Sequence, residues 1–567
     1  MTNTLSASRS ISIPVSVAII VGVVSLVFFP IFILGVPDGY DLMQHMRFAG
    51  AYYDAILKGD LIPVWSAKDN FGFGGIGIRY YPPLAYVVLA LTKLATGNWF
   101  YSFGITTYIW GILGSLGIFF WMRRWTSDTA ALIGAAFYAI IPYHTFQIYQ
   151  AVLYAEFAAS GILPFCFLCL SDLCSRRRWK DVLYFSVSLS LLILTHIPTA
   201  IIATLSLGLF GLLILDRRHF KDTVLKTAIA LFASIAAVSF HVFKAVAEVD
   251  WVKHNSSQYF ANGYYDYKNY LFPIIFSASS IRYIQKMLWH FDTIILITLL
   301  CFAVYFVLRN RAVVASSDKP EARSLNRAVI LTGAFASLML SIVTLFVWNN
   351  VSLLAKIQFP WRWLSVVSIM ASVLFGIGAS ATLSGTKRFA RLAGYPVLLF
   401  VCIVVFYDIS QNILPSTPLD RPTFESKVAG MYDEEACDCW WPIWATQSAF
   451  ENRDRVSAGS RAVEIERWDG LDRSFTVEPG SDPKVRIATF YHPYWKATLN
   501  GEAVNASPGD DGTINIPVSE GKGQINLRFE EPSSSYRFRI VSLFTWAAFL
   551  LVGIILWRRG SRVVENA

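Results

Sequence analysis

The sequence predicts a polytopic α-helical membrane protein of about twelve transmembrane helices, with a β-sandwich domain near its C-terminus on the non-cytoplasmic side. Three observations predict this fold class. The 567 residues are 55% hydrophobic and only 15% charged, whereas soluble domains carry roughly one quarter charged residues. Many apolar runs reach the roughly 20 residues that cross a bilayer core. Basic clusters flank these runs, as in the short cytoplasmic loops of multi-span proteins.

The predicted spans follow the apolar runs along the chain. They are residues 13–34, 100–121, 128–146, 152–173, 181–197, 198–215, 223–246, 287–308, 328–348, 362–384, 394–410 and 538–557. The first run is too long for a signal-peptide core, so we expect it to be retained, with both termini in the cytoplasm. Clusters such as Arg123–Arg124, Arg176–Arg178 and Arg558–Arg559 then face the cytoplasm.

Residues 82–97 differ from the predicted spans. They are apolar but short, and Lys93 lies near their end. Counting them as a span would invert every later segment and place Arg123–Arg124 outside the cytoplasm. We therefore predict an interfacial or re-entrant helix here.

The predicted spans divide the chain into three regions. A multi-helix transmembrane domain covers residues 1–410 and contains a large first outer loop, 35–99. An extracytoplasmic β-rich domain covers 411–537, and 538–567 form the last helix and a basic cytoplasmic tail. Within the second region, Ile514–Ile516 and Ile525–Phe529 alternate cleanly between apolar and polar residues, Val485–Phe490 alternates imperfectly, and Asn500-Gly501 is a hairpin turn signal. We predict a small β-sandwich tethered by a helix at each end.

The net charge of +9 does not indicate a nucleic-acid partner, because the basic residues lie beside predicted spans. Of the seven cysteines, only Cys437 and Cys439 fall in a polar segment. They could form a disulfide or a weak metal site. The lack of a second cysteine pair or a histidine cluster nearby disfavours the metal.

The first outer loop carries the most informative polar residues. Asp38 is a good N-cap for a helix that runs to about Lys58. Asp41 and His45 are one turn apart on this helix and lie off its apolar stripe. A carboxylate beside an imidazole can act as a base, bind a cation or hold a sugar hydroxyl. Alternatively, Asp41 is only the acidic partner in a capping box, although a cap does not explain His45.

Further ionisable residues are predicted near the outer ends of spans. They include Glu156, His196, Lys244 and Arg362. Ionisable groups in a membrane are costly and are functional candidates by default, and together they predict an outward-facing cavity, although each alone could be an interfacial anchor. Arg362 follows Pro360 at the start of a span, where it could hold a lipid phosphate by paired hydrogen bonds or extend to the interface as a snorkelling side chain.

Several short motifs in order resemble a known family. They are Asp41-x3-His45, Tyr80-Tyr81-Pro82-Pro83, Tyr154-Ala-Glu156, Thr195-His196-x-Pro198, Gln358-Phe-Pro-Trp-Arg362 and Tyr494-Trp495-Lys-Ala-x-x-Asn-Gly501. The chain resembles, over nearly its whole length, the bacterial membrane family labelled "6-pyruvoyl-tetrahydropterin synthase-related". It is also similar to the wider C-type glycosyltransferase (GT-C) superfold.

This resemblance implies a membrane glycosyltransferase of the bacterial inner membrane, with the β-domain outside the cytoplasm. It would transfer a sugar from a polyprenyl-phosphate-sugar donor to a glycan, lipid or protein acceptor on the outer face. Asp41 is then the candidate base, His45 its neighbour and Asp38 the alternative acid.

The resemblance also implies a set of donor-binding residues. Arg362 is the phosphate candidate, and the others are Lys244, Glu156, His196, Tyr81 and Gln358. No cofactor is certain. A second acid is matched only loosely, by Asp60 or Asp69, so a divalent cation stays an open alternative. A non-enzymatic transporter or assembly scaffold for lipid-linked envelope polysaccharide is the alternative function, and a structural partner in polymer export is a third.

Overall fold

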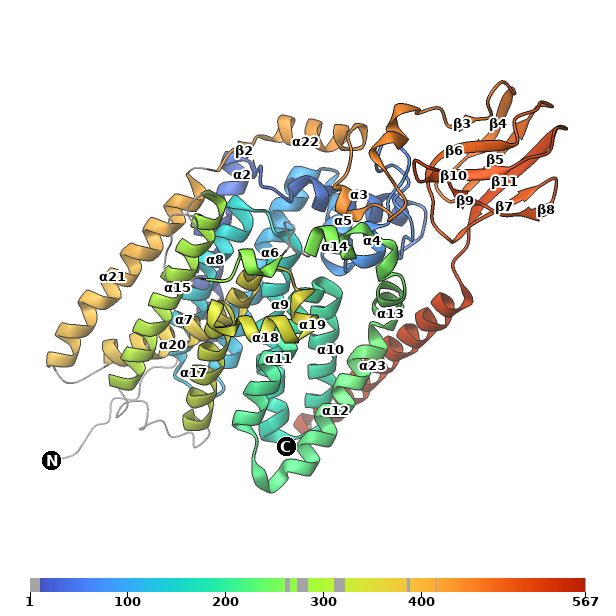
Figure 1. The fold of residues 1–567 in the computed structure, drawn as a ribbon. Helices are drawn as coiled ribbons and strands as arrows, with labels where there is room; N and C mark the ends of the chain where they lie inside the picture. Colours follow the sequence, from blue (N-terminus) through green and yellow to red (C-terminus); the bar gives the residue numbers. More distant parts are fainter. Residues whose placement is uncertain are drawn as a thin grey trace, which may run out of the picture.

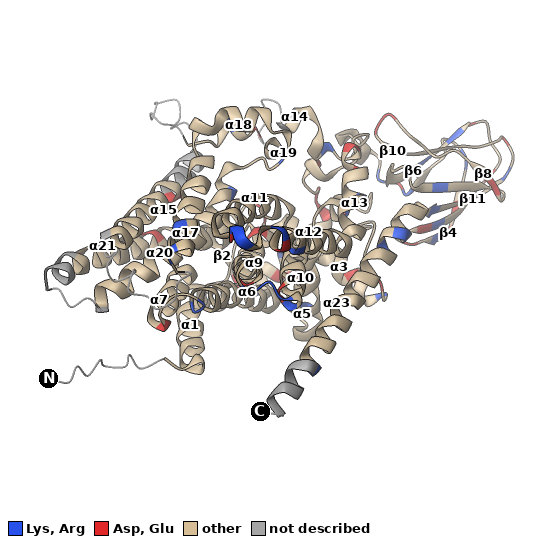
Figure 2. Ribbon diagram, turned by 90° about the horizontal axis from the view of Figure 1, so that it is seen from below, with Lys and Arg blue, Asp and Glu red and all other residues tan. Residues whose placement is uncertain are grey.

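The structure is a computed structural model that describes residues 11–260, 266–272, 284–309, 322–384, 388–414 and 416–565. A helical bundle fills one part of the molecule, and a domain of β-strands projects from it (Figure 1). Charged residues are sparse along the helices of the bundle and more frequent on the β-domain (Figure 2). This distribution agrees with a bundle solvated mainly by lipid.

Eight segments of the described chain are long and apolar enough to cross a membrane. They are Ile13–Leu34 (α1 and α2), Trp99–Met122 (α6), Asp128–Gln150 (α7, α8 and η1), Tyr154–Arg176 (α9), Ile197–Ile214 (α11), Pro360–Leu383 (η8 and α20), Gly394–Ile413 (within α21, Arg388–Ile413) and Ser533–Arg558 (within α23, Ser533–Glu565). The predicted fold class, a multi-span helical protein with a C-terminal β-sheet domain, is confirmed. The count of twelve spans is not reached by this criterion.

The remaining predicted spans correspond to helices that are shorter, bent or less apolar. Helix α10 (Trp179–Thr195), α15 (Ile284–Arg309) and α17 (Ala322–Met339) cover three of them. Helix α17 ends at Met339 instead of continuing to residue 348, and the chain goes on through the short helices α18 (Leu345–Asn350) and α19 (Ser352–Ala355).

The span predicted over 223–246 is broken. Helix α12 (Phe220–Ala237) and α13 (Ser239–Ala247) meet at a 73° bend and would make a ninth span if counted together. Two side chains of α23 form hydrogen bonds with the backbone at this break. Ser542 Oγ accepts the Phe240 N–H at 3.1 Å and donates to Ala236 O at 3.2 Å, and Trp546 Nε1 donates to Ala237 O at 3.0 Å. Backbone that leaves helical geometry within a membrane needs such partners.

The first outer loop contains α3 (Leu42–Leu57), α4 (Gly77–Tyr80) and α5 (Leu84–Thr96). Helix α5 has 13 residues, too few to cross the bilayer core, so the treatment of 82–97 as a non-spanning helix agrees with its length. The predicted N-cap at Asp38 is wrong, because α3 begins at Leu42 and Asp41 occupies the cap position without a side-chain capping bond. The turn before α3 is held by a residue far away in the sequence. The Asp41 N–H donates to Ala151 O at 3.2 Å.

The β-domain consists of two antiparallel sheets that share one apolar core. One sheet has the order β3-β6-β10-β9, and the other has the order β4-β5-β11-β7-β8. Their bounds are β3 Val456–Ser457, β4 Val463–Trp468, β5 Asp472–Val477, β6 Lys484–Phe490, β7 Trp495–Leu499, β8 Glu502–Val504, β9 Ser507–Pro508, β10 Thr513–Pro517 and β11 Gly523–Phe529. Trp65 and Phe73 of the first outer loop belong to the same core. The outer loop is therefore part of the β-domain's packing, and a second link pairs β1 (Val36–Pro37) with β2 (Pro418–Leu419).

The predicted hairpin turn between β7 and β8 is present. Asn500 and Gly501 have φ angles of 53° and 89°, as a type I′ turn requires. Replacing Gly501 by alanine is expected to lower the free energy of unfolding by about 1 kcal/mol, because an L-residue is disfavoured at positive φ. Gly521→Ala is the matched control: a Cβ meets nothing within 4 Å at either glycine, and only Gly501 has a positive φ. Equal effects in denaturant unfolding of the two variants would contradict this assignment.

Candidate functional site

The candidate site is built around Arg362, which lies in the short helix η8 (Pro360–Trp363) at the start of α20 (Leu364–Ser384). Its side chain is buried, with Nε donating to Glu156 Oε2 at 3.1 Å. Nη1 donates to Ile357 O and, at 3.4 Å, to Gln358 Oε1. Arg362 is therefore fixed inside the protein by a carboxylate and does not snorkel to the interface. None of the described residues accepts a hydrogen bond from its Nη2, so that nitrogen is available to a ligand.

Glu156 is held by a second set of donors from an irregular helical segment. Its Oε1 accepts from the Tyr143 hydroxyl and from Gln147 Nε2, the latter at 3.2 Å. Gln147 belongs to η1, a π-helical turn covering Phe146–Gln150. Such turns are rare and occur frequently at functional sites. The π-turn orients the glutamate that in turn orients Arg362.

Asp41 lies close enough to this pair to interact with both charges. Solvent reaches its side chain. Desolvation by surrounding protein nevertheless raises the pKa of Asp41 to about 6, against the attraction of Arg362 and with a contribution from the like charge of Glu156. Both observations fit a carboxyl set back from the surface and open to water on one side. A carboxylate with this pKa is ionised at neutral pH and still basic enough to accept a proton.

His45 is close to Asp41 in sequence but has a different environment. It is buried, and its Nδ1 lies 2.7 Å from the Tyr86 hydroxyl. Burial lowers the pKa of His45 to about 3, so the ring is neutral at pH 7. Its Nε2 has no hydrogen-bond partner among the described residues. The predicted neighbour of the base is thus a neutral imidazole packed among aromatic rings.

Tyr81, His196 and Gln358 also come to this cluster. The Tyr81 ring lies 5.9 Å from His45 and 6.1 Å from His196, measured between ring centroids. Gln358 Nε2 donates to His254 Nε2 at 2.5 Å, which requires a neutral ring, and burial together with Arg362 lowers the pKa of His254 to about 4. His254 was not predicted from the sequence, since it stands in an outer loop without any periodic pattern.

Two non-glycine residues beside the cluster have left-handed backbone conformations. Val152 has φ 53° and Gln358 has φ 69°. A positive φ is a genuine outlier for a β-branched residue, and such conformations persist where the surrounding structure enforces them. Val152 lies just after the π-turn that holds Glu156, and Gln358 contacts Arg362.

Trp440, in the segment before the β-domain, packs against one side of the cluster. Trp440 stacks on His254 with ring centroids 4.4 Å apart and lies 5.6 Å from Tyr81.

Immediately before Trp440, Cys437 and Cys439 are joined in a disulfide, which settles the alternative between disulfide and metal site. Among the described residues, no three side chains of His, Cys, Asp or Glu are grouped so as to hold a metal ion.

Two predicted site residues lie elsewhere. Asp38 pairs with Lys427 Nζ at 2.7 Å on the surface. Lys244 Nζ lies 3.7 Å from Glu531 in a second cluster. The loosely matched acid Asp69 lies 3.8 Å from Arg47 Nη1. The structure therefore joins Asp41, His45, Glu156, His196, Tyr81, Gln358 and Arg362, and it separates Asp38 and Lys244 from them.

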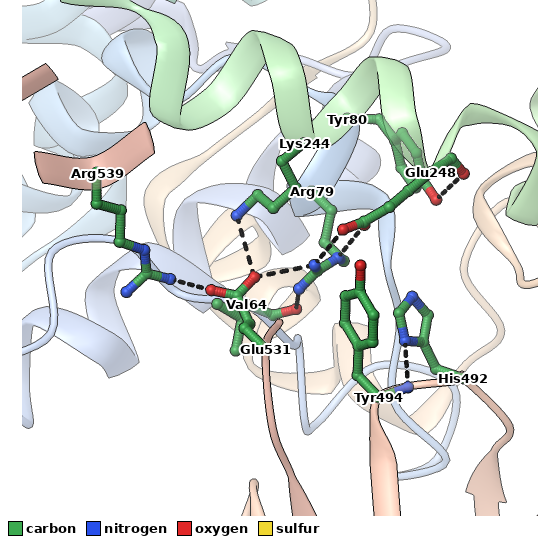
Figure 3. Close-up of polar contacts among 9 residues, drawn as sticks. All are labelled: Val64, Arg79, Tyr80, Lys244, Glu248, His492, Tyr494, Glu531 and Arg539. Atoms are coloured by element: carbon green, nitrogen blue, oxygen red, sulfur yellow. Dashed lines mark hydrogen bonds and ion pairs between the residues drawn. The ribbon is translucent and has the colours of Figure 1, made fainter. Parts of the chain in front are cut away.

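The second cluster is a buried ionic network centred on Arg79 of α4 (Figure 3). Arg79 donates to both oxygens of Glu248 at 2.7 Å and to Glu531 Oε1 at 2.9 Å. Its Nη1 donates to Val64 O at 3.0 Å. Arg539 pairs with the other oxygen of Glu531. The network ties the first outer loop, the end of α13 and the junction of β11 with α23, and Tyr81 of the candidate site follows α4 directly.

Comparison with solved structures finds membrane glycosyltransferases. The archaeal oligosaccharyltransferase AglB from Archaeoglobus fulgidus, in complex with an inhibitory peptide and a dolichol-phosphate, is 12% identical over 72% of this chain and 56% of its own, with a TM-score of 0.46. ArnT from Cupriavidus metallidurans, bound to undecaprenyl phosphate, is 13% identical over 65% of this chain and 79% of its own, with a TM-score of 0.34. The arabinofuranosyltransferase AftD from Mycobacteria is 14% identical over 74% and 27%, with a TM-score of 0.43.

The chain spans a little over half the length of the first of these structures. No curated protein sequence matches it. A family model does match, over residues 78–414, and its description is "6-pyruvoyl-tetrahydropterin synthase related domain; membrane protein". This match covers more than half of the chain and includes Tyr81, Glu156, His196, Gln358 and Arg362. The chain belongs to this family of 6-pyruvoyl-tetrahydropterin synthase-related membrane proteins.

Proposed function

We propose that the protein is a membrane glycosyltransferase that moves a sugar from a polyprenyl-phosphate donor to a glycan, lipid or protein acceptor. The reaction takes place on the outer face of a bacterial inner membrane, with both termini in the cytoplasm. The observation that carries this proposal is the water-accessible Asp41 carboxyl beside the fixed pair of Arg362 and Glu156. A base can accept the proton of the acceptor hydroxyl, and a guanidinium can stabilise the departing phosphate, so the two groups in one cluster support sugar transfer.

Asp41 and Arg362 have separate roles in the proposed reaction. Asp41 accepts the proton of the acceptor hydroxyl while that oxygen forms a bond to the anomeric carbon of the sugar. The bond from the anomeric carbon to the phosphate oxygen breaks, and the electron pair leaves with the polyprenyl phosphate. Arg362 stabilises the charge that develops on this phosphate, through the Nη2 that donates to none of the described residues. Glu156 acts on the reaction only by holding Arg362 in place.

Charge balance in the cluster has a consequence for donor binding. With Asp41 ionised, Asp41 and Glu156 carry one negative charge more than Arg362 supplies. A bound phosphodiester adds another, so it raises the pKa of Asp41 above its value in the free protein. Donor binding and proton uptake by Asp41 are therefore linked.

The test is a transfer assay with purified protein in lipid vesicles and radiolabelled polyprenyl-phosphate sugars. The rate is expected to rise with pH through a midpoint at or above about pH 6, because Asp41 has to lose its proton before it can act as a base. The same vesicles report donor movement between leaflets, which is the activity expected of a transporter. A rate that is equal at pH 5 and pH 8 would contradict the role of Asp41, and movement of donor without transfer would favour the transporter.

A further inference from the structure

Arg461 and Arg473 are buried arginines of the β-domain. They differ in whether their N–H groups have hydrogen-bond acceptors. Arg461 donates to the carbonyl oxygens of Glu478, Asp482, Ser519 and Gly521 at 2.7–3.0 Å. Arg473 is more deeply buried, at 1% exposure. Its Nε and Nη1 have no hydrogen-bond partner among the described residues. Buried guanidinium groups are normally satisfied, as Arg461 is, so Arg473 needs an explanation.

Arg473 lies on the inner face of the five-stranded sheet. It stands in β5, two residues before the core residue Phe475, and pairs across the strands with Trp468 and Leu527. Its guanidinium carbon lies 4.3 Å from the ring centroid of Trp468 and 5.1 Å from that of Trp495. These cation–π contacts offset part of the cost of burying the charge. They do not accept the N–H groups at the edge of the guanidinium.

The charge of Arg473 is also uncompensated within the described chain. Among the described residues, the charge that acts on it is another cation, Arg455, whose guanidinium lies 5.6 Å from the Trp468 ring centroid. Burial, together with Arg455, lowers the pKa of Arg473 to about 9. An arginine paired with a carboxylate would shift in the opposite direction.

The polar groups next to Arg473 are donors as well. Trp495 Nε1 and Trp65 Nε1 are buried without partners, and their rings lie 5.5 Å apart. His492 lies 6.4 Å from Trp65 and accepts the Tyr494 N–H on Nδ1 at 3.3 Å, as Figure 3 also shows. Its proton therefore resides on Nε2, which is buried and has no acceptor among the described residues. Donors from the five-stranded sheet, the β6–β7 loop and the first outer loop thus lie in one region without an acceptor among the described residues.

We propose that this end of the β-sandwich binds a small singly charged anion, a carboxylate or a halide, at the edge of the Arg473 guanidinium. Water could occupy the neutral donors, but it would leave the buried positive charge uncompensated. An anion supplies both the acceptor atoms and the opposite charge. The site joins the β-domain to the outer loop through Trp65. Its ligand comes either from solution, as chloride, or from an acidic sugar residue of a glycan.

The experiment uses the full-length protein in detergent, in a buffer without chloride or carboxylate. Sodium chloride, sodium glucuronate and neutral glucose are titrated separately. Hydrogen exchange of residues 463–477 and 495–499 and the thermal unfolding midpoint are measured. In the wild type, an anion is expected to slow exchange and raise the midpoint, because a ligand that binds only the folded state stabilises it.

Two variants separate a specific site from a general effect of salt. Arg473→Met should lose the response and be no less stable than the wild type without anion, because it removes an uncompensated buried charge. Arg467→Met removes the same charge from an exposed position in the adjacent strand and should keep the response. If Arg473→Met does not fold, the exchange data of the wild type and of Arg467→Met decide alone.

Each outcome bears on the proposal. A response to chloride and glucuronate, but not glucose, supports a site open to acidic sugars. A response to chloride alone supports a closed site for a small ion. The absence of a response in the wild type, or equal responses in the wild type and Arg473→Met, would overturn the proposal.

Discussion

Replacement of Arg79 by methionine is expected to lower the free energy of unfolding by about 3–5 kcal/mol, the cost of breaking a buried ion pair from one side. The side chains of Arg79, Glu248 and Glu531 are 0%, 2% and 4% exposed. Without Arg79, Glu248 keeps no cationic hydrogen-bond partner among the described residues, whereas Glu531 retains Lys244 and Arg539. The Glu248 carboxylate, which loses its hydrogen-bonded cation, is therefore the main source of the loss.

Thermal or denaturant unfolding of the full chain in detergent measures this effect. Lys522→Met is the control, because it breaks an ion pair with Glu478 whose side chains are 61% and 43% exposed, and such pairs contribute only about 0–1 kcal/mol. Combining Arg79→Met with Glu248→Met removes the stranded carboxylate and should recover part of the loss. A double variant that is less stable than either single variant would show that the network does not act as a pair of opposite charges.

The second large effect is expected on activity. Asp41→Asn keeps the size and polarity of the side chain but cannot accept a proton at neutral pH, so transfer is expected to fall about 10²–10⁴-fold. Asp38→Asn is the matched control in the same loop. Asp38 pairs with Lys427 on the surface, so this variant should transfer sugar at the wild-type rate. The reverse result would assign the base to Asp38.

Stability separates this loss of activity from misfolding. The pKa of Asp41 is raised on folding to about 6, so between about pH 4 and 6 the folded state binds more protons than the unfolded chain, and stability falls as pH rises. Asp41→Asn removes this contribution. The variant is therefore expected to be no less stable than the wild type at pH 7.5, measured by thermal unfolding. An inactive variant that unfolds more easily would leave the loss of activity without a catalytic explanation.

The membrane fold could be predicted because hydropathy and charge are local properties of the chain. The apolar runs mark the helices, and the basic clusters distinguish 82–97 from a span. The β-strands 484–490, 513–517 and 523–529 were visible through alternation. Strand β4 was missed because most of its side chains are exposed on both faces, and β5 because nearly all of its residues are buried.

The candidate site could be predicted only in part. Asp41 stood out through its one-turn spacing to His45, and Glu156 and Arg362 stood out because ionisable residues near the ends of predicted spans are uncommon. The residues that contact them are distant in the sequence, so the sequence alone does not identify them. Lys244 faces Glu531, a residue nearly three hundred positions away, and the start of α3 depends on Ala151. His254 and Trp440 were missed for the same reason, since their stacking joins two loops with no sequence pattern.

The role of α23 at the α12–α13 bend limits how the chain can be dissected. A truncation that ends before residue 533 would leave the carbonyl oxygens of Ala236 and Ala237 without the donors that Ser542 and Trp546 provide. Each unsatisfied group in hydrocarbon costs several kcal/mol, so the bundle would have to rearrange. An excision that replaces the strands 456–529 by a flexible linker and keeps the last helix avoids this penalty. The C-terminal helix is thus a structural component of the bundle as well as the tether of the β-domain.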